Sequence, residues 1–220
     1  MAENGASRSE ILEETGAVLG CTGANLTVQE GEISVLMGLS GSGKSTLLRV
    51  IAGLLPAAGG SIVFDDGYVF PDLDGRTTPA PSDLAASLHY LGHQNAMKTA
   101  LSVNENLRFW QAFSGRPHLD IAEALDMVGL ETVGELPFGY LSTGQRRRIA
   151  IAKLLVSYRP IWLLDEPTAG LDKRSESQFS ALMRAHCEDG GMIIAATHIP
   201  LGLVGVKGLE MGTGARGTSG

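Results

Sequence analysis

The chain has 220 residues, of which 44% are apolar and 19% charged, so it can bury a sizeable core and is not disordered in bulk. Its formal net charge of −7 disfavours general binding to nucleic-acid phosphates. No apolar run approaches the length of a membrane span, and Cys21 and Cys187 are too few for a disulfide framework or a four-ligand zinc site. We expect one globular domain without a secretory signal, in a reducing, cytosolic setting.

Short apolar runs alternate with helical patterns along the first half of the chain. The polar residues 1–10 are expected to be a flexible end. Residues 65–83 contain three prolines together with acids and glycines, and they predict a loop. The other expected elements are strands at 33–37, 61–64 and 88–91 and a helix at 44–52.

The second half continues the alternation. Ser102 and Glu105 have the spacing of a capping box, which predicts a helix from 103 to about 113. The stretch from about 96 to 142 has no strand pattern and is interpreted as a helical insertion. The remaining expected elements are helices at 121–128, 143–157 and 175–187, strands at 161–164 and 192–196, a basic helix face at 146–148, and a flexible glycine-rich end at 212–220.

The strands are apolar throughout and are separated by helices. Such strands are typical of a parallel sheet that is covered on both faces. We therefore predict an α/β fold with a mostly parallel core sheet.

A glycine-rich segment follows the first predicted strand and matches the pattern G-x-x-x-x-G-K-[ST]. Its glycines let the backbone curl so that several N–H groups point inward, and the next helix adds the positive end of its dipole. We predict a phosphate-binding loop, with a plain glycine-rich turn as the alternative. Lys44 is expected to bind the β- and γ-phosphates, and Ser45 to ligate Mg²⁺. The candidate nucleotide-binding residues are Gly38, Leu39, Ser40, Gly41, Ser42, Gly43, Lys44, Ser45 and Thr46.

Two carboxylates, Asp165 and Glu166, follow the strand predicted at 161–164. In open α/β sheets, ligands bind beyond the carboxyl ends of the strands, where this strand would deliver both acids. We predict that Asp165 ligates Mg²⁺ and that Glu166 is a general base or positions the attacking water. The alternative is a strand that runs into an acidic turn.

The sequence LSTGQ at 141–145 precedes a basic helix, and DEPTAGLD at 165–172 follows the strand. Together with the phosphate-binding loop, these motifs make residues 11–211 resemble the ATP-binding-cassette (ABC) ATPases. The resemblance implies a P-loop NTPase fold with an N-terminal β-rich part and a helical subdomain at about 96–142. It also implies ATP and Mg²⁺ as ligands, and a head-to-tail dimer.

In such a dimer, Ser142, Gly144 and Gln145 would contact the nucleotide held by the partner chain, although Ser142 also has the spacing of a helix cap. The resemblance further implies that Gln94 senses Mg²⁺ and water. The same resemblance implies that His198 contacts the γ-phosphate and that Asp172 lies in a loop at the dimer interface. The family's usual adenine-stacking aromatic is missing, because no aromatic residue precedes Phe64.

Two subfamilies are represented. Residues at about 54–211 resemble the ATPase of the bacterial haem exporter for cytochrome c maturation, most distinctively at 88–110 and around 168–203. Residues 11–49 instead resemble choline and glycine-betaine importer ATPases. The resemblance implies that the helical insertion and the loop of Gln94 dock on the membrane subunit. These parts are haem-exporter-like, which favours the haem system. The expected partners are a second ATPase subunit, identical or not, and an integral membrane permease, at the cytoplasmic face of the bacterial inner membrane.

Two other classes of function stay open at this point. An ABC protein that acts on DNA or ribosomes is disfavoured by the single cassette and the acidic charge. A nucleotide-binding module with weak catalysis is compatible with the missing aromatic. We therefore expect ATP hydrolysis coupled to transport, and no nucleic-acid partner.

Overall fold

The computed structural model describes residues 13–14, 20–63, 69–70, 86–198, 201–203 and 205–211. The flexible ends predicted at 1–10 and 212–220 lie outside these residues. The described strands are β1 (Ile33–Met37), β2 (Ile62–Val63), β3 (Val69–Phe70), β4 (Leu88–Leu91), β5 (Ile161–Asp165), β6 (Met192–Ala196) and β7 (Lys207–Glu210). The α-helices named here are α2 (Lys44–Ile51), α4 (Val103–Ser114), α5 (Ile121–Met127), α6 (Thr143–Leu155) and α7 (Lys173–Glu188).

Five strands form the main sheet, in the order β4-β5-β6-β1-β7. Every pairing in this sheet is parallel, which confirms the predicted α/β class. The small strands β2 and β3 pair antiparallel with each other, so Val69–Phe70 forms a strand inside the stretch predicted as a loop.

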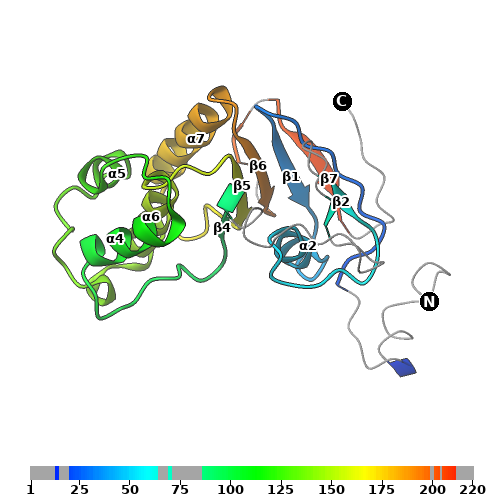
Figure 1. Cartoon of the computed structure of the whole chain (residues 1–220), viewed down its shortest axis with the longest axis horizontal. Coiled ribbons are helices and arrows are strands. Elements are labelled where there is room, and N and C mark those ends of the chain that lie inside the picture. The colour runs from blue at the N-terminus through cyan, green and yellow to red at the C-terminus, as the bar shows by residue number, and fades with distance from the viewer. Residues whose placement is uncertain are drawn as a thin grey trace.

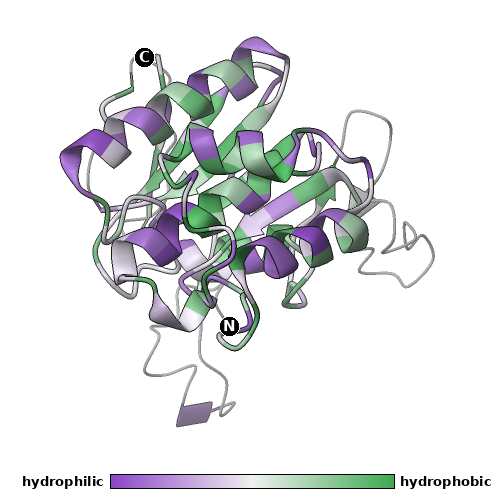
Figure 2. Ribbon diagram, turned by 90° about the vertical axis from the view of Figure 1, so that its left-hand side faces the viewer, coloured by the Kyte–Doolittle hydropathy of each residue, from purple (hydrophilic) through white to green (hydrophobic). Residues whose placement is uncertain are grey.

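Alternate residues of the central strands point to opposite faces of the sheet. On β5, Trp162 and Leu164 belong to the apolar cluster that includes Phe179 of α7. Leu163 packs instead in the cluster that includes Leu48 of α2. This two-sided burial explains why the strands are apolar at every position. Figure 2 shows hydrophobic strands between helices that carry their hydrophilic residues outward.

Helices α4, α5 and α6 form a separate group at the side of the sheet, away from α2 and β7 (Figure 1). Ser102 begins α4 with the predicted capping box, since its hydroxyl accepts from the backbone N–H of Glu105 while the Glu105 carboxylate accepts from the N–H of Ser102. Leu107 of α4, Ala124 of α5 and Ile149 of α6 are fully buried in one cluster. Within the described ranges, the helices are too short or too polar to cross a lipid bilayer.

His89 on β4 is a buried histidine whose ring contacts Ser157. It is 5% exposed, and its Nε2–H donates to the carbonyl oxygen of Ser157 at 2.9 Å. Burial is the main cause that lowers the pKa of His89 to about 3, with smaller contributions from the positive charges of Arg159 and Lys153. The folded protein therefore holds this imidazole neutral, whereas the unfolded chain binds a proton near pH 6.5.

We expect the stability to fall as the pH drops from 6.5 towards 3, because only the unfolded state gains the proton. The loss that His89 contributes is about 4 kcal/mol at pH 3. His89→Gln keeps an N–H donor without a titrating ring, so urea unfolding at a series of pH values should give a shallower acid slope. His118→Gln, at an exposed ring, is the control and should keep the wild-type slope. Equal slopes for wild type and His89→Gln would contradict the prediction.

Candidate nucleotide-binding site

Three loops leave the main sheet along one edge. Leu36 of β1 and Asp165 of β5 are both paired in register with Ala196 of β6. The loops that follow these strands therefore begin side by side, at the carboxyl edge where open α/β sheets bind ligands. The predicted phosphate-binding loop, the carboxylate pair and His198 are brought to the same edge.

The loop between β1 and α2 requires glycine at three positions, for different structural reasons. Gly43 has a φ of 99°, and a Cβ there would lie 2.1 Å from the carbonyl oxygen of Gly20. Gly38 also lies tightly, because its Cβ would be 2.6 Å from the carbonyl oxygen of Met211. A Cβ at Gly41 would meet nothing within 4 Å, so that position needs glycine only for its φ of +79°. The loop is held at both ends and open in the middle.

Lys44 lies inside the curl of this loop. It is 7% exposed, and its ammonium donates to the carbonyl oxygens of Gly38 at 2.6 Å and Leu39 at 3.1 Å. Leu39 and Ser40 are themselves exposed at the tip, while Thr46 in the first turn of α2 packs against Gly20. The loop therefore presents a fixed positive charge at the start of a helix whose first turn has no side-chain cap.

Asp165 is buried, at 4% exposure, and both of its carboxylate oxygens accept hydrogen bonds. The Ser45 hydroxyl donates to Oδ1 at 2.8 Å and the Tyr90 hydroxyl to Oδ2 at 3.4 Å. Ser45 and Asp165 are 120 positions apart, yet the fold joins them directly. A hydroxyl and a carboxylate are the hard oxygen donors that Mg²⁺ prefers, so this pair fits the metal predicted there.

Tyr90 was missed by the sequence analysis, as was Arg49 beside it. A hydrogen bond with the Tyr90 hydroxyl raises the pKa of Arg49, and burial raises the pKa of Tyr90. In the sequence, Tyr90 is only one member of a predicted strand. The available signal was the alternation along β4, since Tyr90 shares the face of its neighbour Leu88.

Glu166 has an unusual backbone, with a φ of 46°. Its N–H donates to the carbonyl oxygen of Ala196 at 2.8 Å, which ties the end of β5 to the end of β6. Its Oε2 lies 3.0 Å from Nδ1 of His198. The two predicted residues are therefore in contact. Non-glycine residues adopt this backbone region at a cost, and they do so most often at functional sites.

The LSTGQ segment forms the start of α6. The Ser142 hydroxyl accepts from the N–H of Gln145, and the Gln145 side chain accepts from the N–H of Ser142. A Cβ at Gly144 would lie 3.0 Å from the carbonyl oxygen of Gly170, so this turn packs closely on the 165–172 segment. Asp172 caps α7 by accepting from the N–H of Ser175. The capping interpretation of Ser142 is confirmed, and it leaves the other predicted role open.

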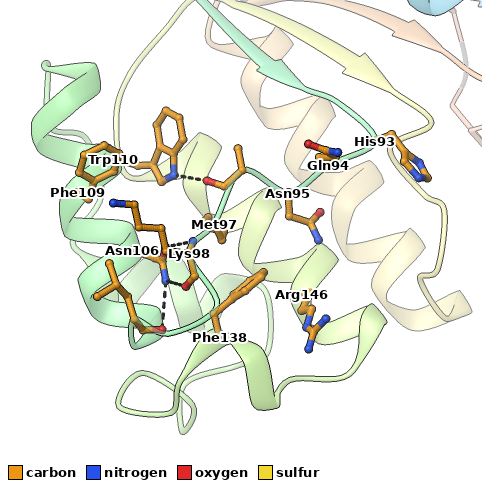
Figure 3. A pocket seen from close by; sticks show the side chains of 12 residues that line it. His93, Gln94, Asn95, Met97, Lys98, Asn106, Phe109, Trp110, Phe138 and Arg146 are labelled. Atoms are coloured by element: carbon orange, nitrogen blue, oxygen red, sulfur yellow. Dashed lines mark hydrogen bonds between the residues drawn. The ribbon is translucent and has the colours of Figure 1, made fainter.

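Gln94 lies in a pocket of about 640 Å³ between the end of β4 and the helical group (Figure 3). Gln94 and Asn95 lie on one side, and the rings of Phe109, Trp110 and Phe138 on the other. Among the described residues, Gln94 makes no hydrogen bond to Ser45 or Asp165. The structure thus brings together the predicted residues of the loops after β1, β5 and β6, whereas Gln94 lines the pocket beside the helical group.

A parallel sheet with a phosphate-binding loop after β1 and an aspartate at the end of β5 defines the class of P-loop NTPases. The family model described as ABC transporter matches residues 21–169. The chain therefore belongs to the ABC transporter family, and the predicted ABC-type ATPase is confirmed.

Curated relatives place the chain more closely. It is 59% identical to the cytochrome c biogenesis ATP-binding export protein CcmA of Mesorhizobium japonicum, over 90% of this chain and 94% of that protein. It is 54% identical to the CcmA of a Chelativorans species, over 91% of this chain and 95% of the relative. These matches confirm the resemblance to the haem-exporter subfamily, and their extent includes most of the segment that resembled the importers.

Solved structures share the fold. A bacterial ABC transporter cassette, solved as a dimer, is 29% identical with a TM-score of 0.72, covering 86% of this chain and 84% of that chain. A cassette dimer in a post-hydrolysis state, bound to ADP and Pi, is 28% identical with a TM-score of 0.74, covering 90% of both chains. The predicted fold class is confirmed by these likenesses.

Proposed function

We propose that this chain is the ATP-hydrolysing subunit of the haem exporter that serves cytochrome c maturation. The observation that carries the proposal is the set of charged and polar groups gathered at one edge of the sheet: the Lys44 ammonium, the Ser45–Asp165 pair and the Glu166–His198 pair. The 59% identical relative named for cytochrome c biogenesis and export supports the particular system.

The phosphate-binding loop, residues 38–46, holds the polyphosphate of ATP. Lys44 exchanges its bonds to the carbonyls of Gly38 and Leu39 for bonds to the β- and γ-phosphate oxygens. Ser45 and Asp165 would hold Mg²⁺, and the resemblance to ABC ATPases implies Gln94 as a further ligand. The bound metal would supply positive charge that offsets charge developing on the phosphates. The single hydroxyl–carboxylate bond at 2.8 Å supports this assignment.

Glu166 orients the attacking water and takes its proton, while His198 contacts the γ-phosphate. Their 3.0 Å contact lets the imidazole hold the Glu166 carboxylate in one direction. A base of this kind contributes about 10²- to 10⁴-fold to a rate.

A second subunit completes each site. Ser142, Gly144 and Gln145 at the exposed start of α6 contact the γ-phosphate bound by the partner chain, and Asp172 lines the interface. A helix start with free backbone N–H groups suits an anion. The likeness to cassettes solved as dimers supports this arrangement.

The pocket beside Gln94 is proposed as the surface that receives the membrane permease. Phe109 is 51% exposed and stacks on Phe113, which is 69% exposed, at a ring distance of 5.8 Å. Exposed clusters of this kind mark interaction surfaces. Within the described residues, Oδ1 of Asn95 and Nε of Arg146 are buried without a hydrogen-bond partner in this pocket. An apolar helix with a few polar groups would satisfy both features, and docking there places the chain at the cytoplasmic face of the inner membrane.

Complementation tests the proposal. In a bacterium that lacks its own cytochrome c biogenesis export ATPase, expression of this chain should restore c-type cytochromes, measured by haem staining of its membranes. The double variant Phe109→Ser and Phe113→Ser should hydrolyse ATP when purified but fail to restore them. Phe179→Leu, inside the core, is the matched control and should restore them. Restoration of glycine-betaine uptake instead would assign the chain to an importer.

A further inference from the structure

Arg147 is a buried arginine whose function the sequence did not indicate. The sequence predicted a basic helix face at 146–148, but Arg147 is only 5% exposed and does not belong to a surface face. The reason is geometric. Successive residues of a helix lie about 100° apart, so three adjacent positions cannot share one face. Arg147 therefore points from α6 into the protein.

The guanidinium of Arg147 donates to four backbone carbonyls. It reaches Gly92 at 2.8 Å, Asp165 at 3.0 Å, Glu166 at 2.8 Å and Pro167 at 3.0 Å. These acceptors belong to two segments that are far apart in the sequence. Gly92 lies two residues before Gln94, and the other three form the end of β5 and the start of its loop.

The buried charge has no carboxylate among these hydrogen-bond acceptors. Burial lowers the pKa of Arg147, and the charges of Asp165 and Glu166 oppose that effect. A charged side chain that is bonded only to carbonyls is costly to bury unless all its donors are used. The planar fork of arginine suits four carbonyls in different directions, which the single ammonium of a lysine cannot reach together.

Arg147 donates to the carbonyl of Glu166, a residue whose backbone conformation is itself unfavourable. The φ of 46° at Glu166 is a backbone conformation that is energetically unfavourable for a residue other than glycine. The two flanking peptide groups are both fixed, since the N–H of Glu166 donates to Ala196 and its carbonyl accepts from Arg147. The direction of the Glu166 carboxylate depends on this backbone conformation.

We propose that Arg147 is a positioning residue for hydrolysis, which locks the Glu166 peptide, the start of the Gln94 loop and helix α6 into one rigid unit. The inference rests on the proposed function, because it assigns catalysis to Glu166.

The test separates positioning from simple stability. Arg147→Gln and Arg147→Lys are compared with wild type for kcat and KM with MgATP. We expect kcat to fall about 10- to 100-fold in both variants, because a misplaced catalytic group loses rate without losing binding. The KM should change by no more than about threefold, since Arg147 does not touch the phosphate-binding loop.

Arg159→Gln is the matched control. Arg159 is also partly buried and donates to two carbonyls, those of Leu88 at 2.7 Å and Ser114 at 3.1 Å, at the opposite end of β4. We expect it to lower Tm like Arg147→Gln while kcat stays at the wild-type value. A third readout is ATP-dependent dimerisation of the Glu166→Gln variant. Adding Arg147→Gln to this variant should leave its dimerisation intact, because Arg147 is proposed to act on the hydrolytic step only.

Three results would overturn the inference. They are a wild-type kcat in Arg147→Gln, full recovery by Arg147→Lys, or an equal loss of kcat in Arg159→Gln. An inactive wild-type protein would contradict the proposed function itself, and the inference with it. Active wild type with unaffected Arg147 variants contradicts the inference alone.

Discussion

Glu166→Gln is expected to reduce ATP turnover by at least about 100-fold while ATP binding persists. The amide has the shape of the carboxylate and can still meet His198, which lies 3.0 Å away, but it cannot take a proton from water. ATP should then remain bound between two subunits instead of being consumed. Phosphate release measures the first effect, and size-exclusion chromatography with ATP measures the second as a shift to dimer.

The control for this variant is Glu188→Gln, at the exposed end of α7, which should keep wild-type turnover and elution. A Glu166→Gln variant that stays strictly monomeric with ATP would count against the dimeric site. Undiminished phosphate release would remove Glu166 from the proposed role.

Lys44→Met is expected to weaken ATP binding by about 100-fold. Methionine keeps most of the buried volume but removes the ammonium, which donates to two loop carbonyls at 2.6 and 3.1 Å and is proposed to bind phosphate. One charge-assisted hydrogen bond to phosphate contributes about 1.5–3 kcal/mol, which corresponds to that change in affinity. Equilibrium binding of a fluorescent ATP analogue measures it directly.

Lys207→Met is the matched control, because it removes an ammonium at the amino end of β7 that pairs with Glu32 at the surface. Such pairs contribute about 0–1 kcal/mol to stability, and nucleotide affinity should not change. If Lys44→Met bound the analogue as tightly as wild type, the loop would not be the phosphate site.

Much of the site could be predicted because its signals are local. The phosphate-binding loop is a contiguous pattern, and the strand before Asp165 is recognisable from apolar residues alone. That Ser45 and Asp165 meet follows from parallel strands that end at one edge. The capping boxes at Ser102 and Ser142 were likewise contained in four consecutive residues.

The rest depended on tertiary contacts. Strand β7 was missed because it is a short edge strand in which only Leu209 is buried, so it has little apolar pattern. Tyr90 and Asp165 are 75 positions apart in the sequence, and they interact because β4 and β5 are neighbours in the sheet. Arg147 looked like a surface charge because three arginines stand in a row. All three donate to backbone carbonyls, and only the folded chain shows that Arg147 alone among them is buried. Composition cannot distinguish a solvated charge from a buried one.

The close approach of Met211 to Gly38 has a practical meaning for protein engineering. The N–H of Met211 donates to the carbonyl of Met37 at 2.7 Å, and its own carbonyl oxygen lies where any side chain on Gly38 would have to go. Met211, which directly follows β7, therefore supports the start of the phosphate-binding loop at Gly38, more than 170 positions earlier in the sequence. A shortened version of the polypeptide must therefore retain residue 211, since trimming into that strand would loosen the nucleotide pocket as well as the sheet.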